Sequence, residues 1–306
     1  MEIIRPGINI DLVGKMKIAS VASLIAIIIS ILSLALHGGP NLGIDFAGGT
    51  QVQVQFSQEA DAEGIRSSLQ TIGLGNSVIQ RFGYQANNEF LIKTEKSDAE
   101  LEGLSNKIAE ALATSYGKEN VEIRRVEVVG PKVGKDLRQK GLLAMLYAVI
   151  GILVYVTWRF ELRYAVGAIV ALIHDVIITV GVFSLLGKEF SLPIIAALLT
   201  IIGYSLNDTI VVYDRIRENI KGARRQPLKE LVNSSINQVL SRTVLTSVTT
   251  LLVVLGLFFL GGAVIHDFAF ALLVGVIVGT YSSVFVASPT VLVWETISPS
   301  KEKRKQ

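Results

Sequence analysis

The chain has 306 residues, of which half are hydrophobic and 18% are charged, and its net charge is +3. Soluble proteins carry charge on about a quarter of their residues, so this composition indicates helices that face lipid. The absence of cysteine excludes disulfides, zinc–thiolate sites and thiol catalysis, and three scattered histidines argue against a histidine metal site. The small net charge gives no reason to expect nucleic-acid binding, and no cofactor is expected.

Six segments are long and apolar enough to cross a bilayer, which takes about 20 mostly apolar residues. They are residues 18–36, 141–158, 164–187, 190–213, 243–265 and 268–294. The first run is longer than that of a signal peptide and no A-x-A cleavage site follows it, so we predict an uncleaved anchor. The expected fold is a polytopic α-helical membrane protein with six transmembrane helices.

Lysine and arginine in short loops set the orientation of such a protein, because they favour the cytoplasmic side. These residues gather in the predicted N-terminal segment 1–17, between spans two and three, in the basic loop 214–242 and in the tail 295–306. Only Lys188 lies in a short loop on the opposite side. Both termini are therefore expected in the cytoplasm, and residues 37–139, between the first helix and helices 2–6 in 140–294, are expected outside it.

Residues 37–139 have the size of a domain. Alternating apolar residues predict strands at 49–56, 77–84, 89–94 and 121–129; helical spacing predicts helices at 59–71 and 98–116, the second capped by Ser97. The order β-α-β-β-α-β is that of a ferredoxin-like α+β domain. This topology names no function, and its sequence has no catalytic triad or phosphate loop. We interpret it as a handle or a binding surface.

Ionisable residues inside a span cost roughly 2.5–3.5 kcal/mol and are candidate functional residues. Asp208 lies in the fourth span, seven residues before Arg215, and thus roughly 10 Å inside the cytoplasmic boundary. Arg242 opens the fifth span near the same level, so a proton arriving at Asp208 could release Arg242 from an ion pair. Two plainer interpretations stay open: Arg242 only sets orientation, and Asp208 only hydrogen-bonds a neighbouring Ser or Thr.

Two further polar groups lie in the spans. His174 and Asp175 stand halfway along the third span and are candidates for the same proton pathway, with a purely structural polar contact as the alternative. Thr243, Thr246 and Ser247 follow the arginine that opens the fifth span. Their hydroxyls can orient water or bond across helices, and we expect them to support the pathway.

Four stretches together resemble one family. They are 43–50 (GIDFAGGT), 129–134 (VGPKVG), 203–219 (GYSLNDTIVVYDRIREN) and 241–250 (SRTVLTSVTT). They are similar to the SecF family, the smaller half of the SecD–SecF accessory complex of bacterial protein export. The third stretch is long and specific, whereas SecD shares the first, and the small outside domain favours SecF.

The resemblance implies an RND-type half that pairs with a pseudo-symmetric SecD half in the bacterial inner membrane. It implies use of the proton-motive force for late steps of preprotein translocation, after the ATPase SecA has acted through SecYEG. YajC and YidC are implied as further partners, and an unfolded preprotein as the ligand of the outside domain. Asp208 and Arg242 match the family's proton-pathway positions, and His174 and Asp175 match a motif shared within it. No enzyme activity and no nucleotide site are implied.

Two other functions stay open. The chain could be an assembly subunit of the translocon, in which the charges inside the membrane only hold helices together. It could also be a small-molecule efflux half-transporter of RND type. The outside domain is small and has no second copy in the sequence, which argues against efflux.

Overall fold

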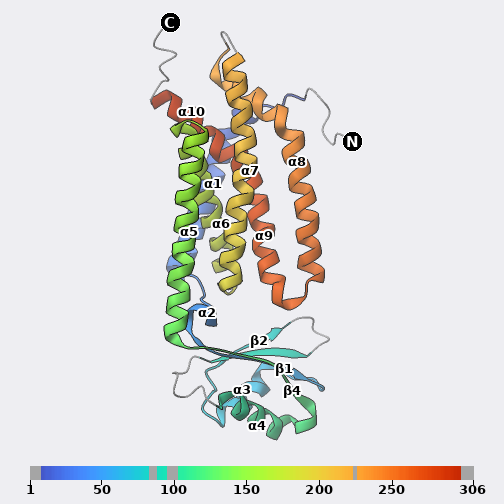
Figure 1. Ribbon diagram of the computed structural model, residues 1–306. Helices are drawn as coiled ribbons and strands as arrows, with labels where there is room; N and C mark the ends of the chain where they lie inside the picture. Colours follow the sequence, from blue (N-terminus) through green and yellow to red (C-terminus); the bar gives the residue numbers. More distant parts are fainter. Residues whose placement is uncertain (1–7, 83–87, 95–102, 223–225, 298–306) are drawn as a thin grey trace.

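The computed structural model describes residues 8–82, 88–94, 103–222 and 226–297, and within them six long helices stand side by side above a small domain (Figure 1). The long helices are α1 (Leu12–Leu36), α5 (Pro131–Arg159), α6 (Leu162–Leu185), α7 (Leu192–Gly222), α8 (Leu228–Leu260) and α9 (Gly262–Ser282), which continues through η4 (Ser283–Ala287) into α10 (Ser288–Ile297). Each is long and apolar enough to cross a membrane, which confirms the predicted multi-pass helical fold. We call the end where α1 begins and α10 ends the terminal end, and the opposite end the domain end.

The small domain holds a four-stranded antiparallel sheet and two helices. Its elements are β1 (Gly49–Phe56), α3 (Ala62–Gln70), β2 (Val78–Phe82), β3 (Glu89–Thr94), α4 (Leu104–Tyr116), η3 (Lys118–Asn120) and β4 (Val121–Val129). The strand order is β2-β3-β1-β4, and α3 and α4 cover the face turned away from the long helices (Figure 1). This is the predicted ferredoxin-like arrangement.

Alternation along the strands builds the core of the domain. Val52, Val54 and Phe56 of β1 are buried, and so are Ile65 and Leu69 on the inner face of α3. Residues i and i+2 of a strand share a face, as do residues i and i+4 of a helix, so these five side chains meet between the sheet and the helices. The period of the sequence therefore sets which face each element buries.

The two domain helices start differently. α3 follows Asp61, whose carboxylate accepts a hydrogen bond from the backbone N–H of Gly64 at 3.0 Å. Asp61 also acts on the end of α4, because burial and then the charge of Asp61 raise the pKa of Tyr116 above its usual value. α4 begins at Leu104 after Gly103; the first residues of the predicted helix 98–116 and its cap Ser97 lie outside the described residues.

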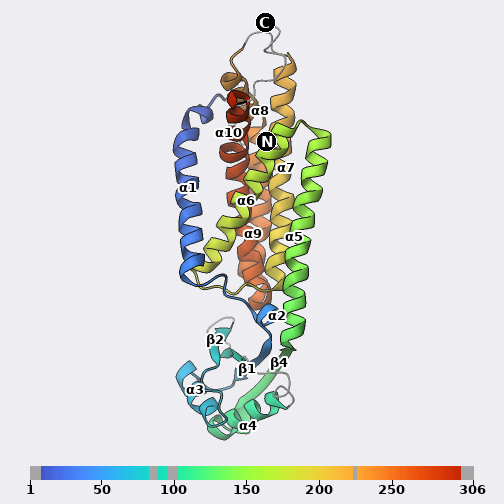
Figure 2. The ribbon, with the colours of Figure 1, turned by 90° about the vertical axis from the view of Figure 1, so that its left-hand side faces the viewer.

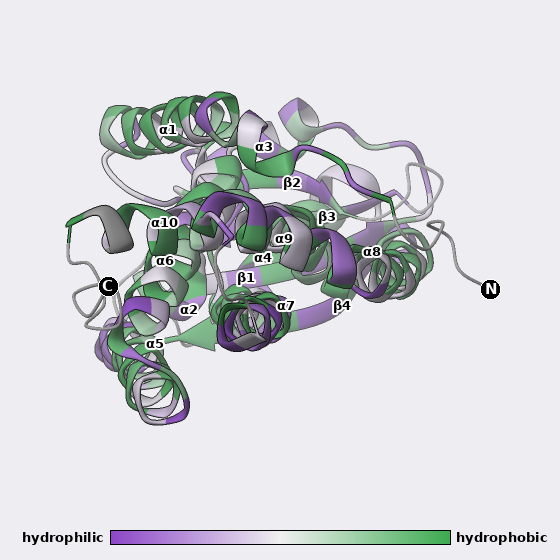
Figure 3. Cartoon of the chain, turned by 90° about the horizontal axis from the view of Figure 1, so that it is seen from above, coloured by the Kyte–Doolittle hydropathy of each residue, from purple (hydrophilic) through white to green (hydrophobic). Residues whose placement is uncertain are grey.

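Three helices form the interior of the bundle. About half of the apolar window of α6 and of α7 is buried, and 44% of that of α9 with α10, compared with 11–17% for α1, α5 and α8. The outer helices present apolar side chains away from the bundle, and α1 and α5 stand on opposite sides of it (Figures 2 and 3). The buried polar side chains of α6, α7 and α9, such as Asp175, Asp208 and Ser282, therefore lie inside the protein and not against lipid.

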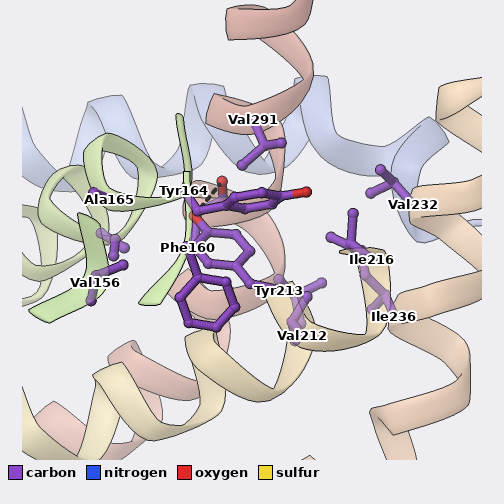
Figure 4. Close-up of a cluster of buried hydrophobic side chains, with 14 of the residues drawn as sticks. Val156, Phe160, Tyr164, Ala165, Val212, Tyr213, Ile216, Val232, Ile236 and Val291 are labelled. Atoms are coloured by element: carbon purple, nitrogen blue, oxygen red, sulfur yellow. Dashed lines mark hydrogen bonds between the residues drawn. The ribbon is translucent and has the colours of Figure 1, made fainter. Parts of the chain in front are cut away.

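Two tyrosines lock α6 to α7 near the terminal end (Figure 4). The rings of Tyr164 and Tyr213 lie 5.0 Å apart, and the Tyr213 hydroxyl donates to the carbonyl of Ala287 at 3.1 Å. Gly167 makes this possible, because a Cβ at that position would overlap the Tyr213 hydroxyl. The cluster fixes α6, α7 and η4 against one another.

The last span contains a π-helical segment that its sequence pattern does not predict. η4 is π-helical and ends two residues before Pro289 of α10, and the side-chain hydroxyl of Ser288 donates to the carbonyl of Ser283 at 3.1 Å. Proline has no N–H to donate to the preceding turn, and a wider turn relieves that mismatch. Such segments often lie at functional sites.

The fifth span ends earlier than the sequence predicted. The apolar pattern gave 243–265, but α8 ends at Leu260 and α9 begins at Gly262, which has φ +71°. Glycine takes this conformation at little cost, so the turn sits at the glycine pair 261–262. The prediction missed it because the apolar residues continue through the turn. α8 also begins at Leu228, well before residue 243, and extends the helix at the terminal end.

This extension of α8 holds the start of α1. Oδ1 of Asn233 accepts hydrogen bonds from the backbone N–H groups of Leu12 and Val13 at 2.9 and 3.1 Å, and Oδ1 of Asn237 accepts one from Ile10 at 2.8 Å. The first N–H groups of a helix have no acceptor within the helix itself. We expect Asn233→Ala to lower the free energy of unfolding by about 1–2 kcal/mol, because the N–H of Val13 loses this acceptor and the N–H of Leu12 keeps only the carbonyl of Ile10, at 2.9 Å.

The thermal midpoint of the purified chain in detergent measures this loss. Ser234→Ala is the matched control, since Ser234 only accepts a hydrogen bond from Gln238 on an exposed face, at 3.1 Å. Equal midpoints for Asn233→Ala and Ser234→Ala would contradict the capping role.

Candidate functional site

The antiparallel packing of α7 and α8 brings two predicted polar residues to one level. The hydroxyl of Tyr204 on α7 donates to Oγ of Ser247 on α8 at 3.3 Å, which fixes the register of the pair. About one helical turn from this bond toward the terminal end, α7 carries Asp208 and α8 carries Thr243. The two side chains thus lie at matched depth, and Thr243 is adjacent on α8 to Arg242, the residue for which the sequence predicted this level.

Asp208 and Thr243 are both buried, and each has a side-chain oxygen that no other described residue hydrogen-bonds. Their exposed fractions are 3% and 2%, and Oδ2 of Asp208 and Oγ1 of Thr243 have no hydrogen-bond partner among the described residues. Nearby hydroxyls behave differently: Thr246 and Thr250 donate to carbonyls of their own helix at 2.9 Å. An unpaired buried polar group costs free energy, so two at one level mark a place where the bundle is not arranged for stability alone.

Arg242 lies beside this level without closing on it. Its side chain is exposed, and none of the ion pairs within 4.0 Å in the described part of the chain joins it to Asp208. It directly precedes Thr243 on α8 and is therefore close to the level of Asp208. The sequence predicted that the two residues could pair, and no ion pair between them is formed in the described part of the chain.

The hydroxyls that follow Thr243 connect α8 to the bundle interior. Ser247 donates to the carbonyl of Thr243 at 2.8 Å, and its Oγ lies 2.7 Å from Oγ1 of Thr280 on α9. Together with Tyr204, these residues make a polar strip across α7, α8 and α9. Ser247 thus contacts other helices, as its predicted supporting role requires, whereas the hydroxyl of Thr246 donates to a carbonyl of its own helix.

Asp175 forms a second polar centre, in which both carboxylate oxygens are engaged. Oδ1 lies 2.8 Å from Nδ1 of His174, and Oδ2 accepts hydrogen bonds from Ser205 on α7 and Ser282 on α9 at 2.6 and 2.8 Å. Asp175 is 1% exposed and His174 is 3% exposed. One carboxylate on α6 therefore ties the three interior helices together.

The same centre reaches α1 through His174. Nε2 of His174 lies 3.2 Å from Oγ of Ser23, which in turn lies 3.0 Å from the hydroxyl of Tyr281. Tyr281 donates to the carbonyl of Ala19 at 2.7 Å, and its ring stacks on the imidazole. The two centres thus have different surroundings: the Asp175 centre is fully hydrogen-bonded, and the Asp208 level is not.

The two centres lie next to each other on α7. Ser205, which binds Asp175, is three residues from Asp208 on the same helix. Gly279 packs against Ser205, because a Cβ at position 279 would lie 3.0 Å from the serine Cβ, and Gly275 leaves room for Ile201 in the same way. The two glycines thereby let α9 approach α7 closely at the site.

Sequence reasoning missed the serines of the Asp175 centre. Ser205 lies inside the stretch 203–219, and Ser282 and Ser23 lie in otherwise apolar spans. A single hydroxyl in a span bonds its own backbone as readily as another helix, so its spacing carries no signal. The pairing depends on the packing of α6, α7 and α9.

Comparison with known protein families identifies the family of this chain. Residues 108–297 match the family described as "Protein export membrane protein SecD/SecF, C-terminal", and residues 35–60 match the "SecD/SecF GG Motif". The chain belongs to the SecD/SecF family. The SecD/SecF GG motif covers the end of α1, the short helix α2 (Ile44–Ala47) and β1, and the C-terminal family region contains both polar centres.

Individual SecF relatives align over nearly their whole length. The chain is 51% identical over 304 residues to "Protein translocase subunit SecF" of Magnetococcus marinus, covering 98% of this chain and 97% of the relative. It is 48% identical over 292 residues to the protein of the same name in Vibrio alginolyticus, covering 95% and 91%. These names describe translocase subunits and not efflux transporters.

Two solved structures have the same fold. The crystal structure of SecDF, described as a translocon-associated membrane protein from Thermus thermophilus, matches with a TM-score of 0.82 and 42% identity over 95% of this chain. A SecDF structure in a super-membrane-facing form matches with a TM-score of 0.72. This chain spans only 39% and 41% of those two chains.

Proposed function

We propose that the chain is the SecF-type half of a SecD–SecF complex that uses the proton-motive force to drive late steps of preprotein translocation across the cytoplasmic membrane. The observation that carries the proposal is the Asp208 carboxyl, whose Oδ2 has no hydrogen-bond partner among the described residues, at the level of Thr243 and next to the position of Arg242. An ionisable group kept in a span without a structural partner is a candidate for proton exchange. Pairing and release of Arg242 would then shift α7 against α8.

The orientation follows from the distribution of basic residues. In this proposal the terminal end faces the cytoplasm, because the positive charges of the short loops gather there. The ferredoxin-like domain then lies on the extracytoplasmic side of a bacterial inner membrane, where an unfolded preprotein emerges from SecYEG. YajC and YidC would be neighbours of the same assembly. No nucleotide hydrolysis by this chain is needed.

The driving force is sufficient in magnitude. One charge that crosses the membrane gains about 2.3 kcal/mol per 100 mV. Moving a two-state equilibrium from 1:99 to 99:1 takes about 5.5 kcal/mol. A few protons per cycle would therefore switch the bundle between two arrangements.

The partner half has a suitable place on α7. On one face of α7, four residues that are small or polar are exposed: Ala196, Thr200, Gly203 and Asn207. Lipid gives no acceptor for an amide, whereas small residues allow another helix to approach closely. The solved SecDF chains are more than twice as long as this chain, which supports a SecD half docked on this face, next to Asp208.

The test uses the complex with SecD and SecYEG in sealed vesicles that carry an imposed proton gradient. Completion of a preprotein already engaged in the channel should be faster with the gradient than after it is dissipated with an uncoupler. The same vesicles without the SecD–SecF pair show how much of this effect belongs to the channel itself. Equal rates with and without the gradient would contradict the proposal.

One observation favours a second, structural role for part of the site. The Asp175 centre is fully hydrogen-bonded to three neighbouring residues, which is what a helix-joining function needs. We therefore assign the assembly role to the Asp175 centre, and the proton response to the Asp208 level. Variants at the two carboxylates separate these roles.

A further inference from the structure

The segment that enters the domain from α1 is hydrogen-bonded to the loop before α7. We call residues 41–48 the entry linker. The backbone N–H of Gly43 donates to the carbonyl of Phe190 at 3.0 Å, and the N–H of Phe190 donates to that of Asn41 at 2.7 Å. This is a short parallel β-bridge between Leu42 and Phe190. The linker thus continues into β1 while it is bonded to the start of α7.

Asp45 in the entry linker caps α7. The backbone N–H of Leu192, the first residue of α7, donates to Oδ2 of Asp45 at 2.8 Å. Pro193 follows and has no N–H, and the N–H of Ile194 bonds the carbonyl of Ser191 at 3.0 Å. A carboxylate at this position also interacts favourably with the positive end of the helix dipole. The cap comes from a residue 147 positions away in the sequence.

The other side of the entry linker is packed on the start of α5 (Figure 2). Gly48 has φ +80°, and a Cβ there would lie 2.9 Å from Cα of Pro131. A Cβ on Gly134 would likewise lie 3.1 Å from the backbone N of Gly48. Phe46 is buried, and its ring lies 6.1 Å from that of Phe190. The linker is therefore held between α5 and the loop before α7.

A second contact joins the domain itself to the same loop. Lys93 of β3 is only 8% exposed and forms an ion pair with Glu189, directly before Phe190. β3 is the neighbour of β1 in the sheet. The domain thus meets the start of α7 at two places, one through the entry linker and one through its own sheet.

We propose that Asp45 is a positioning residue that makes the domain follow the domain end of α7. Asp208 lies 16 residues from Leu192 on one continuous helix, about 24 Å at 1.5 Å per residue. A tilt or shift of α7 at the Asp208 level therefore reaches the capped end, and the cap passes it to the entry linker and β1. The use of this connection in export rests on the function proposed above.

The first test measures the connection without any transport. The chain has no cysteine, so spin labels can be placed on cysteines introduced at the exposed positions Asn106 of α4 and Ala196 of α7. The chain alone in nanodiscs should give a narrow distance distribution. Asp45→Ala should broaden it, whereas Asp45→Asn should keep it narrow, because an asparagine oxygen also accepts the N–H of Leu192.

Asp61→Ala is the matched control for this measurement. It removes an aspartate cap of the same kind, on Gly64 of α3, that has no contact with α7. Its distribution should stay as narrow as that of the unchanged protein. A narrow distribution in Asp45→Ala, or an equally broad one in Asp61→Ala, would overturn the proposal.

The second test adds the gradient in vesicles that contain the SecD partner. Asp45→Ala should lose gradient-driven export while proton uptake continues, and Asp45→Asn should restore the export. Parallel loss of proton uptake and complex yield in Asp45→Ala would instead indicate a folding role and overturn the proposal. If the unchanged complex shows no gradient effect while the spin-label result holds, the proton-driven function fails and the α7–domain connection stands.

Discussion

Replacing Asp208 with asparagine should abolish the gradient-driven part of export and leave the chain folded and assembled. Oδ2 of Asp208 has no hydrogen-bond partner in the described part of the chain, so the substitution removes no bond. Asparagine has nearly the same shape and carries no charge, so it cannot take up or release a proton. The completion rate of an engaged preprotein under a gradient should fall to the rate measured with an uncoupler.

Asp214→Asn is the matched control for this variant. Asp214 lies six residues after Asp208 on α7, toward the terminal end, and approaches Arg159 at 3.5 Å in a solvent-exposed contact, a type of pair worth little. Its export should keep the full response to the gradient. Two readouts belong to each variant, the yield of the SecD complex and the gradient response. Full gradient-driven export by Asp208→Asn would remove the proton role of this carboxyl, and loss of complex yield would make its role structural.

Much of the fold could be predicted because the membrane and the sheet impose simple periods. Six apolar runs of sufficient length became six helices, and alternation in β1 placed Val52 and Val54 in the domain core. The boundaries were less predictable. α8 ends at Leu260 because Gly262 turns the chain, and the apolar residues beyond it conceal the turn. The π-helical η4 depends on how Pro289 is accommodated by packing.

The part of the site that could be predicted is the level of its residues in the membrane, because this level follows from their position along each helix. Counting residues from the ends of the spans placed Asp208 near the start of the fifth span, and the structure puts it level with Thr243. Whether Asp208 and Arg242 are paired could not be deduced, because it depends on side-chain rotamers and on the rotation of each helix. The partners of Asp175 could not be deduced either, since Ser205 and Ser282 meet only through tertiary packing.

Asp175→Ala should have the opposite effect to the substitution at Asp208: a large loss of stability. Three buried groups, on His174, Ser205 and Ser282, would lose the carboxylate that they contact within 2.8 Å. Each buried group left unpaired costs about 1–3 kcal/mol, although the serine hydroxyls can turn to backbone carbonyls of their own helices. We expect a loss of roughly 3 kcal/mol, measured as a lower thermal midpoint and a lower yield of the purified chain.

Asp208→Ala is the internal comparison for this loss, because it truncates an equally buried carboxylate on the neighbouring helix. The alanine at 208 should cost less than the alanine at 175, since only the second removes the partner shared by three buried side chains. Equal losses at the two positions would mean that burial alone decides the cost. A larger loss at 208 would mean that its carboxyl holds the helices together, which would shift the site toward the assembly function. The order of the two midpoints thus separates a carboxylate that builds the bundle from one that the bundle leaves free to react.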